Sequence, residues 1–186
     1  MLEFIKTDKF NDIFEDMCLQ FPKEELKTKE HFLKLFKNGY KAYKIINNEP
    51  IGYILGLEYN DFLFIDYFAI FKKFHSKGFG SLVLKELKNK NIKGIFLEVE
   101  KPDNINQNKE KRIKFYEKNG AKRLDINYLF PTNDKNKFIE MFLYYIPIEI
   151  STPIKDDTYS LIKYIFNTIH KDIPHKNEIL DKIIKS

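Results

Sequence analysis

Gly78 and Gly80 lie between a predicted strand and a predicted helix, where glycines can support anion binding. The strand is the apolar run 62–71, which Asp66 alone interrupts, as is typical of a central strand covered on both faces. The helix is predicted at 80–90. A helix N-terminus exposes unpaired N–H groups, and glycines let the backbone approach an anion closely. The pattern therefore predicts a pyrophosphate cradle, although a purely structural turn fits a Gly-x-Gly pair equally well.

Two common phosphate-binding motifs are excluded by the same segment. A dinucleotide fingerprint requires Gly-x-Gly-x-x-Gly, but position 83 is valine. A P-loop requires Gly-Lys-Ser or Gly-Lys-Thr after a longer glycine loop, and the chain contains neither tripeptide. The loop must therefore belong to another class if it binds phosphate.

The elements that position this loop follow from hydrophobic periodicity and from turn signals. Successive hairpins that end in a single strand–helix–strand crossover predict a mixed sheet and not a doubly wound one. The predicted fold class is α/β (α+β), with a mostly antiparallel sheet, one parallel β-α-β step and flanking helices. In chain order the predicted elements are strand 2–6, helices 9–20 and 24–37, strands 40–46, 51–59 and 62–71, helix 80–90, strand 94–100, helix 109–118, strands around 122–130 and 138–146, and two amphipathic helices after residue 153.

Two segments resemble motifs of one family. Residues 75–80, His-Ser-Lys-Gly-Phe-Gly, are similar to the Arg/Gln-x-x-Gly-x-Gly/Ala motif of the GNAT superfamily of N-acyltransferases. Residues 115–121, Phe-Tyr-Glu-Lys-Asn-Gly-Ala, resemble its Tyr-x-x-x-Gly-Phe element. Their order and the matching element order make the chain resemble a GNAT protein over about residues 1–147. We therefore predict a GNAT domain at 1–150 and a C-terminal helical extension at 151–186.

The resemblance implies acetyl-CoA, or a related acyl-CoA, as the co-substrate. Backbone groups at the end of the apolar strand are expected to bind the cofactor amides and the oxyanion, and the glycine loop the pyrophosphate. Where the family often has an asparagine that contacts the pantetheine arm, this chain has Lys109, with Asn108 adjacent. The expected cofactor-binding residues are Phe68, Ala69, Ile70, His75, Ser76, Lys77, Gly78, Phe79, Gly80, Ser81, Asn108 and Lys109.

The resemblance also implies direct attack of an amine on the thioester. Tyr116 occupies the position of the tyrosine that protonates the leaving sulfur. Asp66 is the first candidate for the base, because burial on an apolar strand favours use of a carboxylate, although a hydrogen-bonded structural role is equally open. Glu98 is the second candidate; it shares a strand face with Glu100, and a solvated strand face is the alternative for both.

Composition argues against several other classes. The 32 basic and 27 acidic residues are mixed along the chain, and only two of the basic residues are arginines, so no nucleic-acid partner is expected. No stretch of about 18 apolar residues is present, so no membrane partner is expected, and we expect a cytoplasmic protein. No metal is expected: the single cysteine, Cys18, is predicted to lie in the core, and His170 and His175 are predicted to face solvent.

The predicted function is an N-acetyltransferase that acts on a primary amine. The amine can be a small molecule or a lysine-type side chain, and a homodimer is one option for its assembly. The alternative is a non-catalytic acyl-CoA-binding regulator on the same fold.

Overall fold

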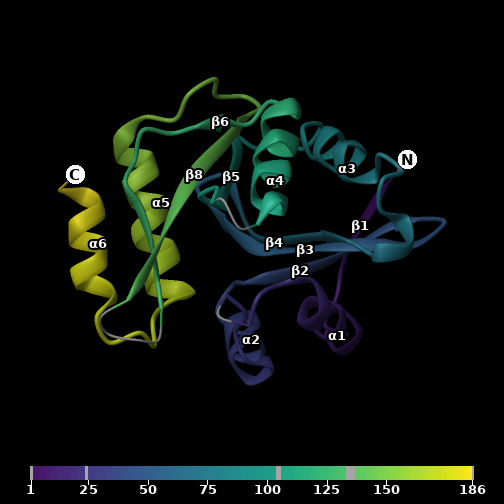
Figure 1. The fold of residues 1–186 in the computed structure, drawn as a ribbon, viewed down its shortest axis with the longest axis horizontal. Helices are drawn as coiled ribbons and strands as arrows, with labels where there is room; N and C mark the ends of the chain where they lie inside the picture. Colours follow the sequence, from purple (N-terminus) through teal and green to yellow (C-terminus); the bar gives the residue numbers. More distant parts are fainter. Residues whose placement is uncertain (1, 24, 104–105, 133–136, 186) are drawn as a thin grey trace. The chain divides into compact units, whose positions relative to one another are not determined.

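The computed structural model describes residues 2–23, 25–103, 106–132 and 137–185. The helices and strands are labelled in Figure 1, and the chain divides into two units. Unit 1 comprises Met1–Glu58 and Phe64–Lys90, and unit 2 comprises Tyr59–Leu63 and Asn91–Ser186.

Unit 1 is built on strands in the spatial order β1-β2-β3-β4. The first pairs are antiparallel, with Phe4 opposite Ile45 and Lys44 opposite Tyr53. Asn48 forms the β2–β3 turn with φ of 62°, a left-handed conformation that asparagine tolerates better than most residues. The elements are β1 (Glu3–Lys6), α1 (Asn11–Gln20), α2 (Lys29–Phe36), β2 (Lys41–Asn47), β3 (Glu49–Tyr59), β4 (Phe62–Ile70), the 3-10 turn η1 (Lys72–Phe74) and α3 (Phe79–Leu87).

The packing of β3 against β4 depends on a glycine. A Cβ added at Gly56 would lie 1.9 Å from the carbonyl oxygen of Phe64, far inside van der Waals contact. Any larger side chain at this position would therefore push the two strands apart.

An aromatic core joins α1 and α2. The ring centroids of Phe10 and Phe32 are 5.1 Å apart, and both side chains are almost fully buried. The second helix begins at Lys29, later than the predicted residue 24, because the Thr28 side chain accepts a hydrogen bond from the backbone N–H of His31 and caps it there. The prediction that Cys18 fills the core is wrong: Cys18 is exposed, and the buried residues of α1 are Ile13 and Met17.

Unit 2 has strands in the order β5-β8-β6, and β7 also pairs with β8. All these pairs are antiparallel, with Leu97 opposite Tyr144 and Leu129 opposite Glu140. The predicted strand around 122–130 is two short strands instead. The elements are β5 (Gly94–Glu100), α4 (Gln107–Lys118), β6 (Lys122–Arg123), β7 (Tyr128–Pro131), β8 (Phe138–Pro147), α5 (Lys155–Thr168) and α6 (Lys176–Ile184).

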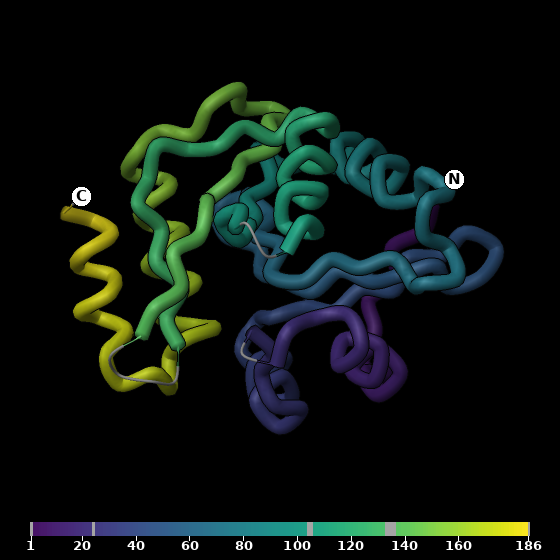
Figure 2. Tube along the Cα trace, in the orientation of Figure 1, coloured from purple at the N-terminus to yellow at the C-terminus, as the bar shows by residue number. Residues whose placement is uncertain are grey.

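Residues 151–186, predicted to be an extension, lie within unit 2, where α6 contacts β7 (Figure 2). The predicted exposure of His170 and His175 is wrong, because they are only 3% and 7% exposed. His170 packs edge-on against Phe130 and Phe166. No helix among the described residues is long and apolar enough to cross a membrane.

Candidate active site

The loop between β4 and α3 has the geometry of an anion-binding turn. Gly78 precedes the helix with φ of 81°, and a Cβ there would meet open space. No side chain caps α3, and among the described residues no partner is present for the N–H groups of residues 77–81. Since unpaired N–H groups at a helix N-terminus favour a negative charge, the loop suits a phosphate-type anion.

Positive charge surrounds this loop. Lys73 forms an ion pair with Glu49 at 2.5 Å, and the ammonium groups of Lys73 and Lys77 lie 4.6 and 5.4 Å from the ring centroid of Phe74. Both lysines are exposed. They can therefore attract a polyanion without any cost of burial.

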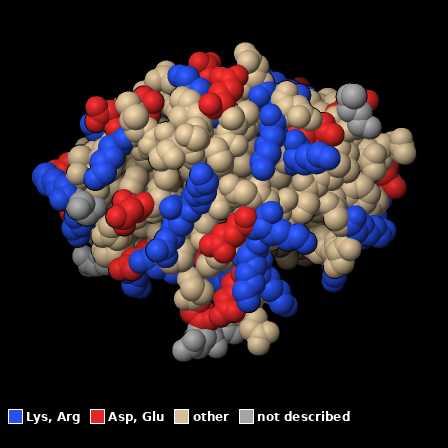
Figure 3. Space-filling model, turned by 90° about the horizontal axis from the view of Figure 1, so that it is seen from above, with Lys and Arg blue, Asp and Glu red and all other residues tan. Residues whose placement is uncertain are grey.

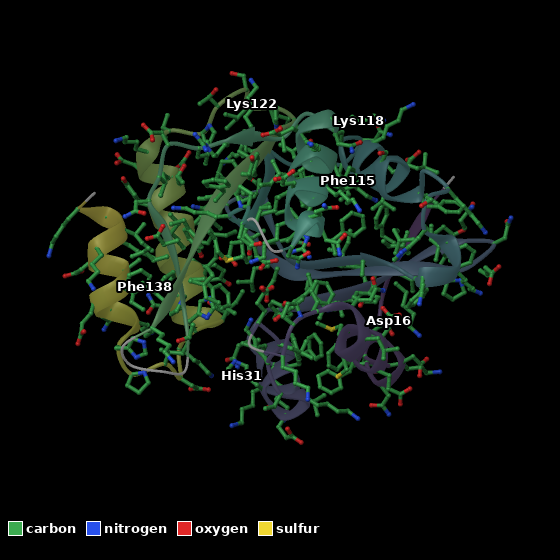
Figure 4. The ribbon with its side chains drawn as sticks, in the orientation of Figure 1. Asp16, His31, Phe115, Lys118, Lys122 and Phe138 are labelled. Carbon is green, nitrogen blue, oxygen red and sulfur yellow. The ribbon has the colours of Figure 1, made fainter. Side chains whose placement is uncertain are left out.

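The end of β4 is tied to its surroundings through one carbonyl. The Ile70 carbonyl accepts a hydrogen bond from the Gln20 amide at 3.2 Å, and His75 Nε2 lies 2.7 Å from the same oxygen. Asp16, labelled on α1 in Figure 4, accepts hydrogen bonds from Gln20 and from the Tyr53 hydroxyl. Burial and this bond to Asp16 raise the pKa of Tyr53. His75, the departure from the family motif, thus links the loop to the strand end.

Along β4, the backbone N–H and C=O groups of successive residues point alternately to the two edges of the strand. Phe71 donates its N–H to the Ile51 carbonyl, and the Ala69 carbonyl lies against Gly52 of β3. Because neighbouring residues of a strand direct their backbone groups to opposite edges, those of Phe68 and Ile70 point away from β3. Ala69 is therefore directed to β3, and not to the edge where we expected it to meet the cofactor.

Asp66 is a paired carboxylate. Its Oδ2 accepts a hydrogen bond from the Tyr40 hydroxyl at 2.5 Å and lies 3.4 Å from the ammonium of Lys27. Its side chain is 5% exposed. Burial of this carboxylate is therefore compensated by a hydroxyl donor and a cation.

The two glutamates of β5 also have partners. Glu98 accepts a hydrogen bond from the Tyr128 hydroxyl. Glu100 is buried and forms ion pairs at 2.9 Å with both Lys109 and Arg112. A solvated strand face is thus wrong for Glu100, because α4 supplies two cations to it.

Lys109 is held by carboxylates on two sides. It contacts Asp103 at 2.8 Å as well as Glu100, and hydrogen bonds to these two groups raise the pKa of Lys109 to about 12. Its neighbour Asn108 is exposed and donates its backbone N–H to the Asn106 side chain that caps α4. Lys109 therefore has a structural role that its position in the motif did not indicate.

Tyr116 lies on the buried face of α4, one position after Phe115, which Figure 4 labels. It is 8% exposed. Burial raises the pKa of Tyr116 to about 12, and the Arg112 guanidinium acts weakly in the opposite direction. The hydroxyl therefore stays protonated at neutral pH and is available as a proton donor.

The predicted site residues thus gather within each unit. Unit 1 contains the loop, the end of β4 and Asp66; unit 2 contains Tyr116, Glu98, Asn108 and Lys109. Sequence reasoning missed Tyr40, Lys27, Tyr128 and Arg112 as partners of the carboxylates. Only Arg112 had a signal, since it follows Lys109 at helical i, i+3 spacing. Within the part of the chain that the structure describes, no group of three or more His, Cys, Asp or Glu side chains could hold a metal ion.

Comparison with known proteins gives consistent matches. The family model described as "Acetyltransferase (GNAT) family" matches residues 8–121. The Bacillus subtilis (strain 168) protein named "Putative acetyltransferase YjbC" is 32% identical over 162 residues, covering 84% of this chain and 80% of that protein. A GNAT-family structure from Bacteroides thetaiotaomicron aligns with a TM-score of 0.74 at 24% identity, covering 91% of this chain and 97% of that one. A Bacillus subtilis acetyltransferase solved in complex with CoA aligns with a TM-score of 0.53 at 15% identity, covering 79% and 99%.

These likenesses confirm the predicted fold class, a mixed α/β fold with a mostly antiparallel sheet and flanking helices. The elements β4, α3 and β5 follow one another in the chain as the predicted crossover requires. The family model spans more than half of the residues, and it includes both segments whose resemblance was noted in the sequence. The chain belongs to the GNAT acetyltransferase family.

Proposed function

We propose that this protein transfers an acetyl group from acetyl-CoA to a primary amine by direct attack. The observation that carries the proposal is the glycine turn before α3, where five consecutive N–H groups, those of residues 77–81, have no partner among the described residues. Family membership supports the same reading. The location is proposed to be the cytoplasm, and a homodimer is one option for its assembly.

Acetyl-CoA would be held first through its pyrophosphate. The N–H groups of residues 77–81 would bind the phosphate oxygens, and exposed Lys77 would add positive charge. Backbone groups near the C-terminal end of β4 would contact the pantetheine amides and the carbonyl oxygen of the thioester. A donor placed there stabilises the negative charge that develops on this oxygen during attack.

Proton transfer needs a donor and an acceptor. Tyr116, protonated at neutral pH, is proposed to donate to the departing thiolate. For the base we favour Glu98 over Asp66. Asp66 Oδ2 already faces the Lys27 ammonium and the Tyr40 hydroxyl, whereas Glu98 accepts a hydrogen bond from the Tyr128 hydroxyl.

Charge distribution supports a small cationic acceptor over a nucleic acid. On the face seen in Figure 3, basic and acidic side chains are interspersed, with no continuous basic surface. A nucleic-acid partner requires a basic patch or stripe. The acceptor class we propose is therefore a primary amine, either a small molecule or a lysine side chain.

The proposal is tested with acetyl-CoA, a panel of primary amines and an assay for free thiol. Thiol release that depends on the amine is expected, and it should be lost in Gly80→Glu, which places a negative charge against the pyrophosphate. The matched control is Asn89→Glu, which adds the same charge beyond the C-terminal end of α3 and should leave coenzyme A affinity unchanged. Calorimetric binding of coenzyme A without thiol release for any amine would instead support a non-catalytic acyl-CoA-binding regulator. Unchanged coenzyme A affinity in Gly80→Glu would refute the assignment of this loop as the pyrophosphate-binding site.

A further inference from the structure

Unit 1 contains a cluster that surrounds a single ammonium group. The Lys27 ammonium lies 3.4 Å from Asp66 Oδ2 and 3.4 Å from the Tyr67 hydroxyl, and 5.2 Å from the centroid of the Tyr67 ring. A carboxylate, a hydroxyl oxygen and an aromatic ring are together the groups that recognise a primary ammonium. We call these residues, Asp66, Tyr67 and Tyr40, the ammonium cage.

The cage is almost fully buried. Tyr40 and Tyr67 are 1% and 4% exposed, and the Asp66 side chain is 5% exposed. Tyr40 holds the carboxylate, and the Tyr67 hydroxyl donates to the Glu25 carbonyl at 2.6 Å, which leaves its oxygen free to accept from a cation. Asp66 and the Tyr67 hydroxyl are therefore positioned by hydrogen bonds that do not involve Lys27.

Lys27, whose ammonium occupies the cage, is on a loop, whereas Asp66 and Tyr67 are on strand β4. Lys27 lies between α1 and α2, outside any helix or strand, and its side chain has four flexible carbons. Withdrawal of this side chain to solvent would leave a passage of its own width that ends at Asp66. Such a passage admits an unbranched alkyl chain and excludes a branched one.

We propose that the ammonium cage binds the terminal primary ammonium of an unbranched alkylamine, and that Lys27 fills it when no such amine is present. Its use in acetyl transfer rests on the proposed function. Asp66 precedes Phe68 by two residues, about 7 Å along the strand. An amine held in the cage would therefore lie beside the part of β4 that we assign to the thioester. Lys27 would compete with that amine for one site.

The test is rescue of a lysine-deleted variant by a small amine, measured by thermal unfolding without acetyl-CoA. Lys27→Ala removes the ammonium and opens the passage, whereas Lys27→Met removes only the charge and keeps the passage filled. Addition of n-propylammonium, which replaces the deleted atoms, should stabilise Lys27→Ala. At about 100 times its dissociation constant the folding equilibrium constant should rise about 100-fold.

Four controls, two variants and two compounds, define the result. Lys27→Met and the double variant Lys27→Ala/Asp66→Asn should not respond to n-propylammonium, and Lys27→Ala should not respond to 1-propanol or to tert-butylammonium. Equal stabilisation of all three variants by n-propylammonium, or of none of them, would overturn the proposal. Because the measurement contains no acetyl-CoA, a failure here is separate from a failure of the proposed acetyl transfer.

A second measurement applies if Lys27→Ala does not fold. Lysines of the wild-type protein are reductively methylated with ¹³C, which preserves their charge, and the signal of Lys27 is assigned by its loss in Lys27→Arg. Addition of n-butylammonium is expected to move this signal toward that of a solvated lysine, while tetramethylammonium should leave it in place. A Lys27 signal that ignores n-butylammonium would show that the lysine is a fixed structural partner of Asp66, against the proposal.

Discussion

Replacement of Tyr116 by phenylalanine removes one hydroxyl from the buried face of α4 and leaves the ring in place. The pKa of this hydroxyl is about 12, against an ordinary value of about 10, so burial disfavours the phenolate by about 3 kcal/mol. Two consequences follow, one for catalysis and one for stability, and each has its own assay.

In catalysis, Tyr116→Phe should lower kcat by about 10²–10⁴-fold if the hydroxyl is the proton donor. Coenzyme A affinity should change little, because the glycine turn is untouched. Since Tyr116 stays protonated up to about pH 12, the variant and the wild type should have pH–rate profiles of the same shape below pH 10. Near wild-type turnover would refute the donor role, and a basic limb below pH 10 that disappears in the variant would refute the raised pKa.

In stability, the folded-state pKa of Tyr116 is raised above the unfolded value. Its contribution is therefore fully present below about pH 10 and is lost as pH rises toward 12. Urea unfolding should show that the wild type loses up to about 3 kcal/mol more than Tyr116→Phe over this interval. Tyr145→Phe is the matched control for catalysis: Tyr145 is also buried with a pKa of about 12, but its hydroxyl donates to the Lys93 and Ile150 carbonyls, so its loss should reduce stability and not kcat.

Further predictions concern the base and the packing. Glu98→Gln should lower kcat/KM and remove the acidic limb of the pH–rate profile, whereas Asp66→Asn should keep that limb; the opposite result would restore Asp66 as the base. Gly56→Ala should destabilise the protein by at least about 1–3 kcal/mol in urea unfolding, since its Cβ would lie 1.9 Å from the Phe64 carbonyl oxygen, and a wild-type urea midpoint would contradict this account of the β3–β4 contact. Phe166→Ala should cost about 3–5 kcal/mol because its ring is fully buried, and a loss below about 1 kcal/mol would mean that α5 is not part of the unit 2 core.

The sequence predicted the elements best where local patterns were strong. The strand 94–100 was predicted with the bounds that β5 has, because its apolar run is flanked by a glycine and by a polar loop. The late start of α2 was missed although Thr28 is a common capping residue, because the apolar spacing before it looked equally helical. Local signals therefore existed for most elements, and errors arose where two signals competed.

Partners of the candidate site were harder to predict because they come from distant parts of the chain. Asp66 meets Tyr40 and Lys27 across 26 and 39 residues, and no periodicity reports such pairs. The burial of His170 was also missed, although it follows Phe166 by one helical turn, because histidine was treated as a polar residue. The identity of a carboxylate's neighbours, and hence its role, required tertiary structure.

Helix α5 is linked to the candidate base Glu98 through one intermediate residue, Tyr128. Phe166 of α5 packs edge-on against Tyr128, and the Tyr128 hydroxyl donates to Glu98. Proteolytic removal of the residues after 150–155 would therefore not release an independently folded domain. It would expose the aromatic side chains of β7 and remove the contact that Phe166 makes with Tyr128, the residue that donates a hydrogen bond to Glu98. We expect natural changes in the length or sequence of this tail to alter turnover even when every residue of β5 is unchanged.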